Sequence, residues 1–154
     1  MKEIPEGGFC ISAFVIISKT NSPEQVLVGR INKKAPWDHI GALDPERVER
    51  HSKGWMLPSS ALMLGEPPKQ AAERILKEQL GVADQSLEGP VVFSEAYGQM
   101  NHWDLEFLFL GQRYNAPSNE VWSELKFIDL TKTGKENMAR GHEDILAHVG
   151  KWKT

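Results

Sequence analysis

The chain has 154 residues, of which 40% are hydrophobic and 25% are charged, and this balance is typical of a single soluble globular domain covering residues 1–154. Its formal net charge is only -3 at pH 7, which argues against general binding of nucleic acid or of an anionic membrane. Cys10 is the single cysteine, so an intrachain disulfide is excluded and a cytoplasmic location is expected.

The first part of the chain predicts a β-hairpin. Residues 9–18, FCISAFVIIS, and residues 25–31, QVLVGRI, are both rich in β-branched side chains. Residues 21–23, NSP, lie between them and are typical of a turn. The longest apolar-rich run, residues 11–17, is too short to cross a bilayer, so we expect no membrane-spanning segment.

A long polar segment follows at residues 32–53. It predicts a functional or mobile loop with one short helix at residues 45–51, because proline suits the first turn of a helix. Residues 55–57 predict a short strand, residues 58–60 a corner, and residues 61–64 a further extended segment.

The central helix is predicted from a proline pair at its start and a glycine at its end. Pro67 and Pro68 open it, and Gly81 occupies a typical position just beyond the last turn. The apolar side chains between them have helical spacing. They are Ala71, Ala72, Ile75, Leu76 and Leu80.

The remaining sequence predicts strands at residues 91–97, 103–110 and 124–130, and a short amphipathic helix at residues 141–150. The order is therefore strands, one central helix, more strands and one late helix. Because no β-α-β unit repeats, this order predicts a mixed α+β sandwich.

Residues 54–82, GWMLPSSALMLGEPPKQAAERILKEQLGV, resemble the signature of the Nudix hydrolases. That signature runs G-x5-E-x7-R-E-U-x-E-E-x-G-U, where U is apolar, and often follows a W-x-L-P-G lead-in. The matching positions are Glu66, Arg74, Leu76, Glu78, Gly81 and Val82, with residues 55–58 matching the lead-in. The resemblance implies an α/β/α sandwich with a mixed sheet, one central signature helix and a C-terminal helix.

The same resemblance implies a function. Nudix hydrolases act on substrates in which a nucleoside diphosphate is linked to another moiety, and they use Mg²⁺ or Mn²⁺. For this chain, the resemblance implies a nucleotide-type small molecule as the ligand and a divalent metal as the cofactor. It also implies homodimer formation, as in many relatives.

Three positions depart from the signature. Ser60 replaces the opening glycine, Ile75 replaces the glutamate after the arginine, and Gln79 replaces the second of the paired glutamates. Helical spacing brings positions 75, 78 and 79 together, and Mg²⁺ prefers carboxylate and other oxygen ligands. Glu78 is the remaining carboxylate at these positions, so we expect hydrolysis to be slower by roughly a thousandfold or more.

Two functions remain open from the sequence. The first is weak or altered metal-dependent hydrolysis of a pyrophosphate, with Glu78 and Glu120 as the catalytic candidates. Glu120 is chosen because the family often recruits an extra carboxylate from this late region. The second is a catalytically inactive module that binds a nucleotide or a protein partner.

Glu78 and Glu66 are the candidate metal ligands, and a second interpretation of Glu66 is an ion pair with Arg74 that ties the preceding loop to the helix. The candidate substrate-binding residues carry groups that pair with phosphate or stack on a base. They are Arg30, Trp37, Arg47, Arg50 and His51.

Overall fold

The computed structural model describes residues 5–152 of the chain. The strands in this range are β1 (Phe9–Lys19), β2 (Ser22–Ile31), β3 (Ser59–Ala61), β4 (Glu88–Tyr97), β5 (His102–Arg113) and β6 (Trp122–Asp129). Together they form one mixed sheet in the order β4-β5-β1-β2-β6, with β3 paired to β1 beside this path. β1 runs parallel to β5, whereas the other pairs within these residues are antiparallel.

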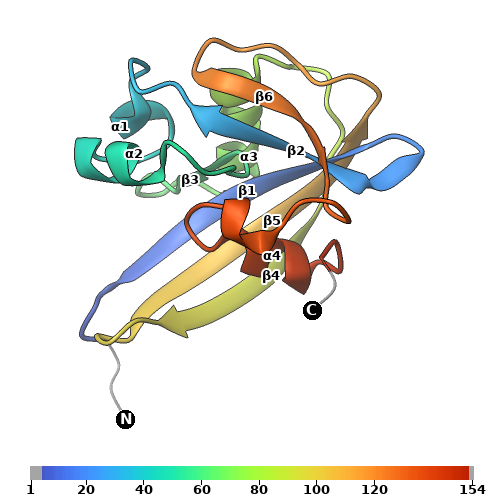
Figure 1. Ribbon diagram of the computed structural model, residues 1–154. Coiled ribbons are helices and arrows are strands. Elements are labelled where there is room, and N and C mark those ends of the chain that lie inside the picture. The colour runs from blue at the N-terminus through green and yellow to red at the C-terminus, as the bar shows by residue number, and fades with distance from the viewer. Residues whose placement is uncertain (1–4, 153–154) are drawn as a thin grey trace.

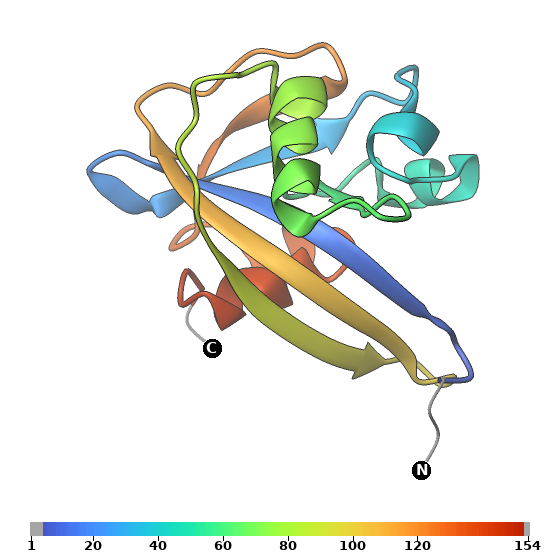
Figure 2. The same cartoon turned by 180° about the vertical axis from the view of Figure 1, so that it is seen from behind.

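Helices cover both faces of this sheet. They are α1 (Trp37–Ile40), α2 (Pro45–His51), α3 (Pro68–Ile75), the π-helical turn η1 (Leu76–Leu80), the 3-10 turn η2 (Lys135–Asn137) and α4 (His142–His148). Figure 1 shows α4 against one face of the sheet, and Figure 2 shows α3 crossing the opposite face. This arrangement confirms the predicted α/β/α sandwich. None of the helices between residues 5 and 152 has the length and apolarity needed to span a membrane.

The side chains of β1 contribute to the core on both faces of the sheet, because successive side chains of a strand point to opposite faces. Phe14 and Ile16 belong to a buried cluster that includes Ile145 of α4. Val15 belongs to a second buried cluster that includes Ile75 of α3. The apolar stripe predicted for the central helix therefore packs on the sheet, and the predicted hairpin and central helix are confirmed.

The chain departs from expectation between residues 55 and 61. The segment predicted as a strand makes only isolated bridges within the described residues, from Trp55 to Met138 and from Met56 to Gly29. The actual strand is β3, which lies across the predicted corner and pairs with β1 through Ser59, Ser60 and Ala61. Small polar residues resemble a turn in sequence, but pairing with a neighbouring strand overrides that local preference.

The polar segment at residues 32–53 carries the predicted helix α2. Asp44 caps it by accepting a hydrogen bond from the Arg47 backbone N–H at 2.9 Å, and Pro45 follows at the first helical position. The four-residue α1 was not predicted. It forms over a third buried cluster in which Trp37, Leu43 and Trp122 meet.

Candidate functional site

Side chains from another segment stabilise the end of the central helix. Trp122 Nε1 donates to the Gln79 carbonyl at 2.8 Å, and Asn119 Nδ2 donates to the Glu78 carbonyl at 3.1 Å. These carbonyls lie in the last turn, where helical partners run out. Gly81 then reverses the chain with a φ of 67°, a left-handed conformation that favours glycine.

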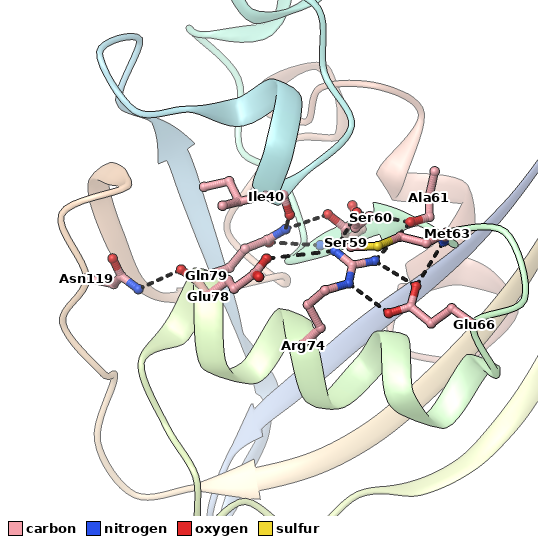
Figure 3. A network of polar contacts seen from close by, with 10 residues as sticks. All are labelled: Ile40, Ser59, Ser60, Ala61, Met63, Glu66, Arg74, Glu78, Gln79 and Asn119. Carbon is pink, nitrogen blue, oxygen red and sulfur yellow. Dashed lines mark hydrogen bonds and ion pairs between the residues drawn. The ribbon is translucent and has the colours of Figure 1, made fainter.

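Glu66 and Arg74 form a bidentate ion pair. Arg74 Nε lies 2.8 Å from Glu66 Oε1, and Arg74 Nη2 lies 3.0 Å from Glu66 Oε2. The same guanidinium donates to the Ala61 carbonyl at 3.1 Å, and the Met63 N–H donates to Glu66 at 2.9 Å. Figure 3 shows how these contacts tie the loop to the helix. The hydrogen bond from Arg74 lowers the pKa of Glu66, which favours the ionised carboxylate. Its oxygens are occupied by the hydrogen bonds from Arg74 and Met63.

Gln79 is fully buried and joins three segments of the chain. Its amide oxygen accepts the Ser59 N–H at 3.2 Å. Its amide nitrogen donates to the Ser59 carbonyl at 2.7 Å and to the Ile40 carbonyl at 2.8 Å. Figure 3 shows the side chain directed into this network. The amide therefore links η1 to β3 and to the end of α1, and its oxygen is committed to a backbone donor.

The metal centre implied by the Nudix signature does not fit the residues that occupy its positions. Ile75 is fully buried in the cluster under α3, and Gln79 is committed to the backbone. Glu66 is bonded to Arg74, while Glu78 is partly exposed and lies 3.8 Å from the same guanidinium. In the described part of the chain, no group of three or more His, Cys, Asp or Glu side chains could hold a metal ion.

The structure does place Glu120 near the last turn of the central helix. Asn119, the preceding residue, bonds the Glu78 carbonyl, and Asn32 Nδ2 donates to the Glu120 carbonyl at 2.8 Å. The Glu120 side chain is exposed. The two predicted catalytic carboxylates therefore belong to adjoining segments.

A cleft of about 720 Å³ lies on the α4 face of the sheet. It is lined by parts of β1, β3, β4 and β5, by α2, and by the start of α4. Ligand pockets for drug-sized molecules usually have volumes of about 300–1,000 Å³. The cleft therefore has room for a nucleotide.

Three of the five predicted substrate-binding residues line this cleft. Arg47, Arg50 and His51 all come from α2. Burial is the main cause that lowers the pKa of His51, and nearby Arg140 adds to the effect. The α2 wall therefore carries two permanently charged guanidinium groups beside an imidazole that favours its neutral form.

Arg30 and Trp37 do not line the cleft. Trp37 is 2% exposed, donates its indole N–H to the Asn32 carbonyl and packs edge-on against Trp122. Arg30 lies over the ring of Trp55, with 3.9 Å from the guanidinium carbon to the ring centroid, and pairs with Glu124. Both side chains are used in packing, away from the cleft lining.

The opposite part of the cleft is acidic, and the sequence-based candidates did not include it. Glu95 of β4, Asp104 and Glu106 of β5, and Asp144 of α4 line it. Asp104 and Glu106 are two residues apart in a strand, so they project from the same face. Two carboxylates at alternate positions of a largely apolar strand, HWDLEFLFL, are a sequence signal that could have revealed this part of the cleft.

Glu106 is the most unusual of these carboxyl groups. The residue is 5% exposed, and its Oε2 atom is buried without a hydrogen-bond partner among the described residues. Burial, followed by the charges of Asp104 and Glu95, raises the pKa of Glu106 to about 8. Asp104 itself is bonded to His102 Nε2 at 2.9 Å.

No protein-family model matches the sequence, and no curated protein sequence matches it significantly. Solved structures do match. The MutT Nudix hydrolase from Burkholderia pseudomallei has a TM-score of 0.64 at 16% identity, covering 92% of this chain and 98% of that one. The Nudix domain of Shewanella oneidensis NrtR, solved with ADP ribose, has a TM-score of 0.65 at 14% identity, covering 98% of this chain and 89% of that one.

The E. coli dihydroneopterin triphosphate pyrophosphohydrolase has a TM-score of 0.56 at 14% identity, covering 95% of this chain and 99% of that one. Matches that extend over nearly the full length of both chains confirm the fold implied by residues 54–82. This chain has the fold of the Nudix hydrolases. At these identities the likeness concerns the fold, and function has to be argued from the site.

Proposed function

We propose that this protein is a member of the Nudix family that binds a nucleoside diphosphate linked to another moiety, and that its metal-dependent hydrolysis is weak or absent. The observation that carries the proposal is the bonding of Gln79. At a position where the signature has a metal-binding glutamate, this chain has a buried amide that forms hydrogen bonds with the backbone of Ser59 and Ile40. The cleft supports ligand binding, because its α2 wall offers Arg47 and Arg50 for phosphates.

A second candidate is slow hydrolysis that relies on Glu78 and Glu120, with Mg²⁺ or Mn²⁺ as the cofactor. The contact of Asn119 with the Glu78 carbonyl favours it, because this contact holds the two carboxylate-bearing segments together. Two carboxylates and bound water are a sparse ligand set for Mg²⁺, which is why we rank hydrolysis second.

The test is a panel of nucleoside diphosphate compounds, including ADP-ribose, assayed for binding and for hydrolysis with Mg²⁺ or Mn²⁺. We expect compounds that bind to raise the melting temperature, whereas turnover stays below about 0.01 s⁻¹, a thousandfold under a common enzyme rate of about 10 s⁻¹. Metal alone is expected to change the melting temperature little, because few carboxylates are available to bind it.

Glu78→Gln and Glu120→Gln are the informative variants, since both remove a charge from a side chain that is not fully buried. The binding proposal predicts that neither variant changes the affinity for ADP-ribose by more than about twofold. Turnover at ordinary enzyme rates, lost in Glu78→Gln, would overturn the proposal of weak or absent hydrolysis. Measurable slow turnover that is lost in both variants would establish the second candidate.

A further inference from the structure

The acidic part of the cleft is built from neighbouring strands. Glu95 on β4 lies directly opposite Asp104 on β5, and Phe93 lies opposite Glu106. Ser12 on β1 is the partner of Glu106 in the parallel pair. The Glu106 carboxyl therefore lies in the interior of the sheet, with strands on both sides.

Two polar atoms in the lining of the cleft are buried without a hydrogen-bond partner among the described residues. They are Glu106 Oε2 and Ser59 Oγ, and each residue is 5% exposed or less. A buried polar group without a partner costs about 1–3 kcal/mol, and a buried carboxyl group costs more if it is charged. Such groups in the lining of a cleft are available to form hydrogen bonds with a ligand.

The α2 side of the cleft has the opposite character. Arg47 and Arg50 line it, and Arg140 also lines the cleft. Burial raises the pKa of both Cys10 and Glu106, and the charge of Arg140 offsets part of the rise in each. Arg47 has the same opposing effect on Cys10. One ligand can therefore meet guanidinium groups at one end and a buried carboxyl group at the other.

We propose that the Glu106 carboxyl group hydrogen-bonds the edge of a ligand's heterocyclic base while Arg47 and Arg50 bind its phosphates. This inference rests on the proposed nucleotide-binding function and adds the residue that reads the base. A carboxyl group presents two oxygens side by side, which matches the paired polar atoms along the edge of a base.

The protonation of Glu106 decides which edge it reads. A neutral carboxyl group has one O–H donor and one C=O acceptor, which match a base edge with an acceptor beside an N–H, such as N1 and the exocyclic amine of adenine. An ionised carboxylate accepts only, and would require two adjacent N–H donors. Because its pKa is raised to about 8, Glu106 is mainly neutral at pH 7 and reads the donor-acceptor edge.

Other titratable groups face the same cleft and set the pH range. They are Cys10 on β1, Glu95 on β4, His102 and Asp104 on β5, His51 on α2, and Arg140, His142 and Asp144 around the start of α4, together with Arg47 and Arg50. The pKa of His51 and that of His142 are both lowered by burial, so both imidazoles favour the neutral form above pH 7. Burial also raises the pKa of Glu95. We expect Glu106, whose pKa is about 8, to control binding between pH 7 and 9, and the variant Glu95→Gln separates the contribution of its neighbour.

The experiment measures the affinity for ADP-ribose by calorimetry between pH 7 and 9.5, a range in which the adenine and the diphosphate do not titrate. Wild-type affinity is expected to fall about tenfold per pH unit above pH 8. Glu106→Gln keeps a donor beside an acceptor, so it is expected to bind within about threefold of wild type at pH 7 and to show no fall above pH 8. Glu106→Leu is expected to lose roughly 10- to 100-fold at pH 7.

Three controls accompany these variants. Glu88→Gln changes an exposed residue of β4 outside the cleft lining and is expected to bind and titrate like wild type. Glu95→Gln removes a neighbouring charge that raises the pKa of Glu106, so it is expected to shift the fall in affinity to lower pH. Inorganic pyrophosphate, which lacks a base, is expected to bind equally well to wild type and to Glu106→Leu. Melting curves confirm that each variant is folded.

The outcomes separate the two proposals. If ADP-ribose binds wild type and both Glu106 variants equally at every pH, the role of Glu106 is overturned and nucleotide binding stands. If Glu106→Gln loses as much affinity as Glu106→Leu, the neutral donor-acceptor contact is wrong. If no compound of the nucleotide panel binds wild type, the proposed function and this inference both fail.

Discussion

Gln79 forms hydrogen bonds with backbone groups of two other segments while its side chain is fully buried. The Ser59 N–H, the Ser59 carbonyl and the Ile40 carbonyl depend on it. A buried amide that satisfies all of these groups stabilises the fold, because leaving any of them unpaired carries a desolvation cost.

Gln79→Leu is therefore expected to lower the free energy of unfolding by roughly 3–5 kcal/mol, measured by urea denaturation at pH 7. Gln79→Glu is expected to cost roughly 2–4 kcal/mol, because an ionised carboxylate cannot donate to the Ile40 and Ser59 carbonyls. That loss should diminish toward pH 5, where a protonated glutamate regains one donor. Lys77→Leu, at an exposed position of the same turn, is the control, and a loss as large as that of Gln79→Leu would contradict this role of Gln79.

Glu66 and Arg74 hold the loop between β3 and α3 in place. Their side chains are only 11% and 12% exposed, so the pair is shielded from water and salt. The expected ion pair between Glu66 and Arg74 accounts for the contacts of both Glu66 carboxylate oxygens. The role of Glu66 as a metal ligand remains a prediction. The two prolines at residues 67 and 68 give this element its abrupt helix start.

Arg74→Ala is expected to destabilise the protein by roughly 2–4 kcal/mol, because it leaves the Glu66 carboxylate without its guanidinium. The pKa of Glu66 is lowered in the folded state, so its contribution is present above the unfolded pKa and is lost as pH falls through the folded value. The difference from wild type should therefore shrink in acid. Arg50→Ala, which breaks an exposed pair with Glu46, should cost no more than about 0.5 kcal/mol. Equal losses in the two variants would contradict the argument.

At the scale of the whole molecule, the order of elements could be predicted because periodicity and turn residues are local signals. The hairpin of β1 and β2 and the helix ending at Gly81 have such signals. The strand β3 could not be predicted, because its pairing with β1 comes from chain segments far apart in sequence.

Some residues of the candidate site could be predicted from the sequence and others could not. The α2 residues Arg47, Arg50 and His51 could be proposed from the sequence, because they cluster in one polar loop. Glu95 and Asp104 could not be joined from the sequence alone, since they face each other only through the register of β4 and β5. Position-by-position comparison with the Nudix signature also does not reveal that Gln79 bonds the backbone of Ile40.

The stability of the molecule should depend on pH through Glu106. Its pKa in the folded state is about 8, compared with an ordinary value of 4.5, so the folded protein binds this proton more tightly than the unfolded chain. The resulting contribution is complete below the unfolded pKa and is lost as pH rises through 8. We expect the free energy of unfolding to fall by roughly 2–4 kcal/mol between pH 5 and pH 9 from this group.

Urea denaturation at pH 5, 7 and 9 measures this dependence. Glu106→Gln should remove most of it, because glutamine does not titrate, whereas the exposed control Glu88→Gln should retain it. A pH profile of Glu106→Gln that matches wild type would show that other groups determine the stability of the protein in this range.

The bonding of Gln79 also has a consequence for the order in which substitutions can accumulate. A single change to glutamate at this position disrupts backbone contacts while Ile75 still occupies the other signature position. A single change at Ile75 places a charge in the cluster under α3. Each first step is therefore expected to lower stability before a second signature carboxylate is present. A glutamate at either position is therefore expected to be tolerated only together with changes in the residues that Gln79 and Ile75 now contact.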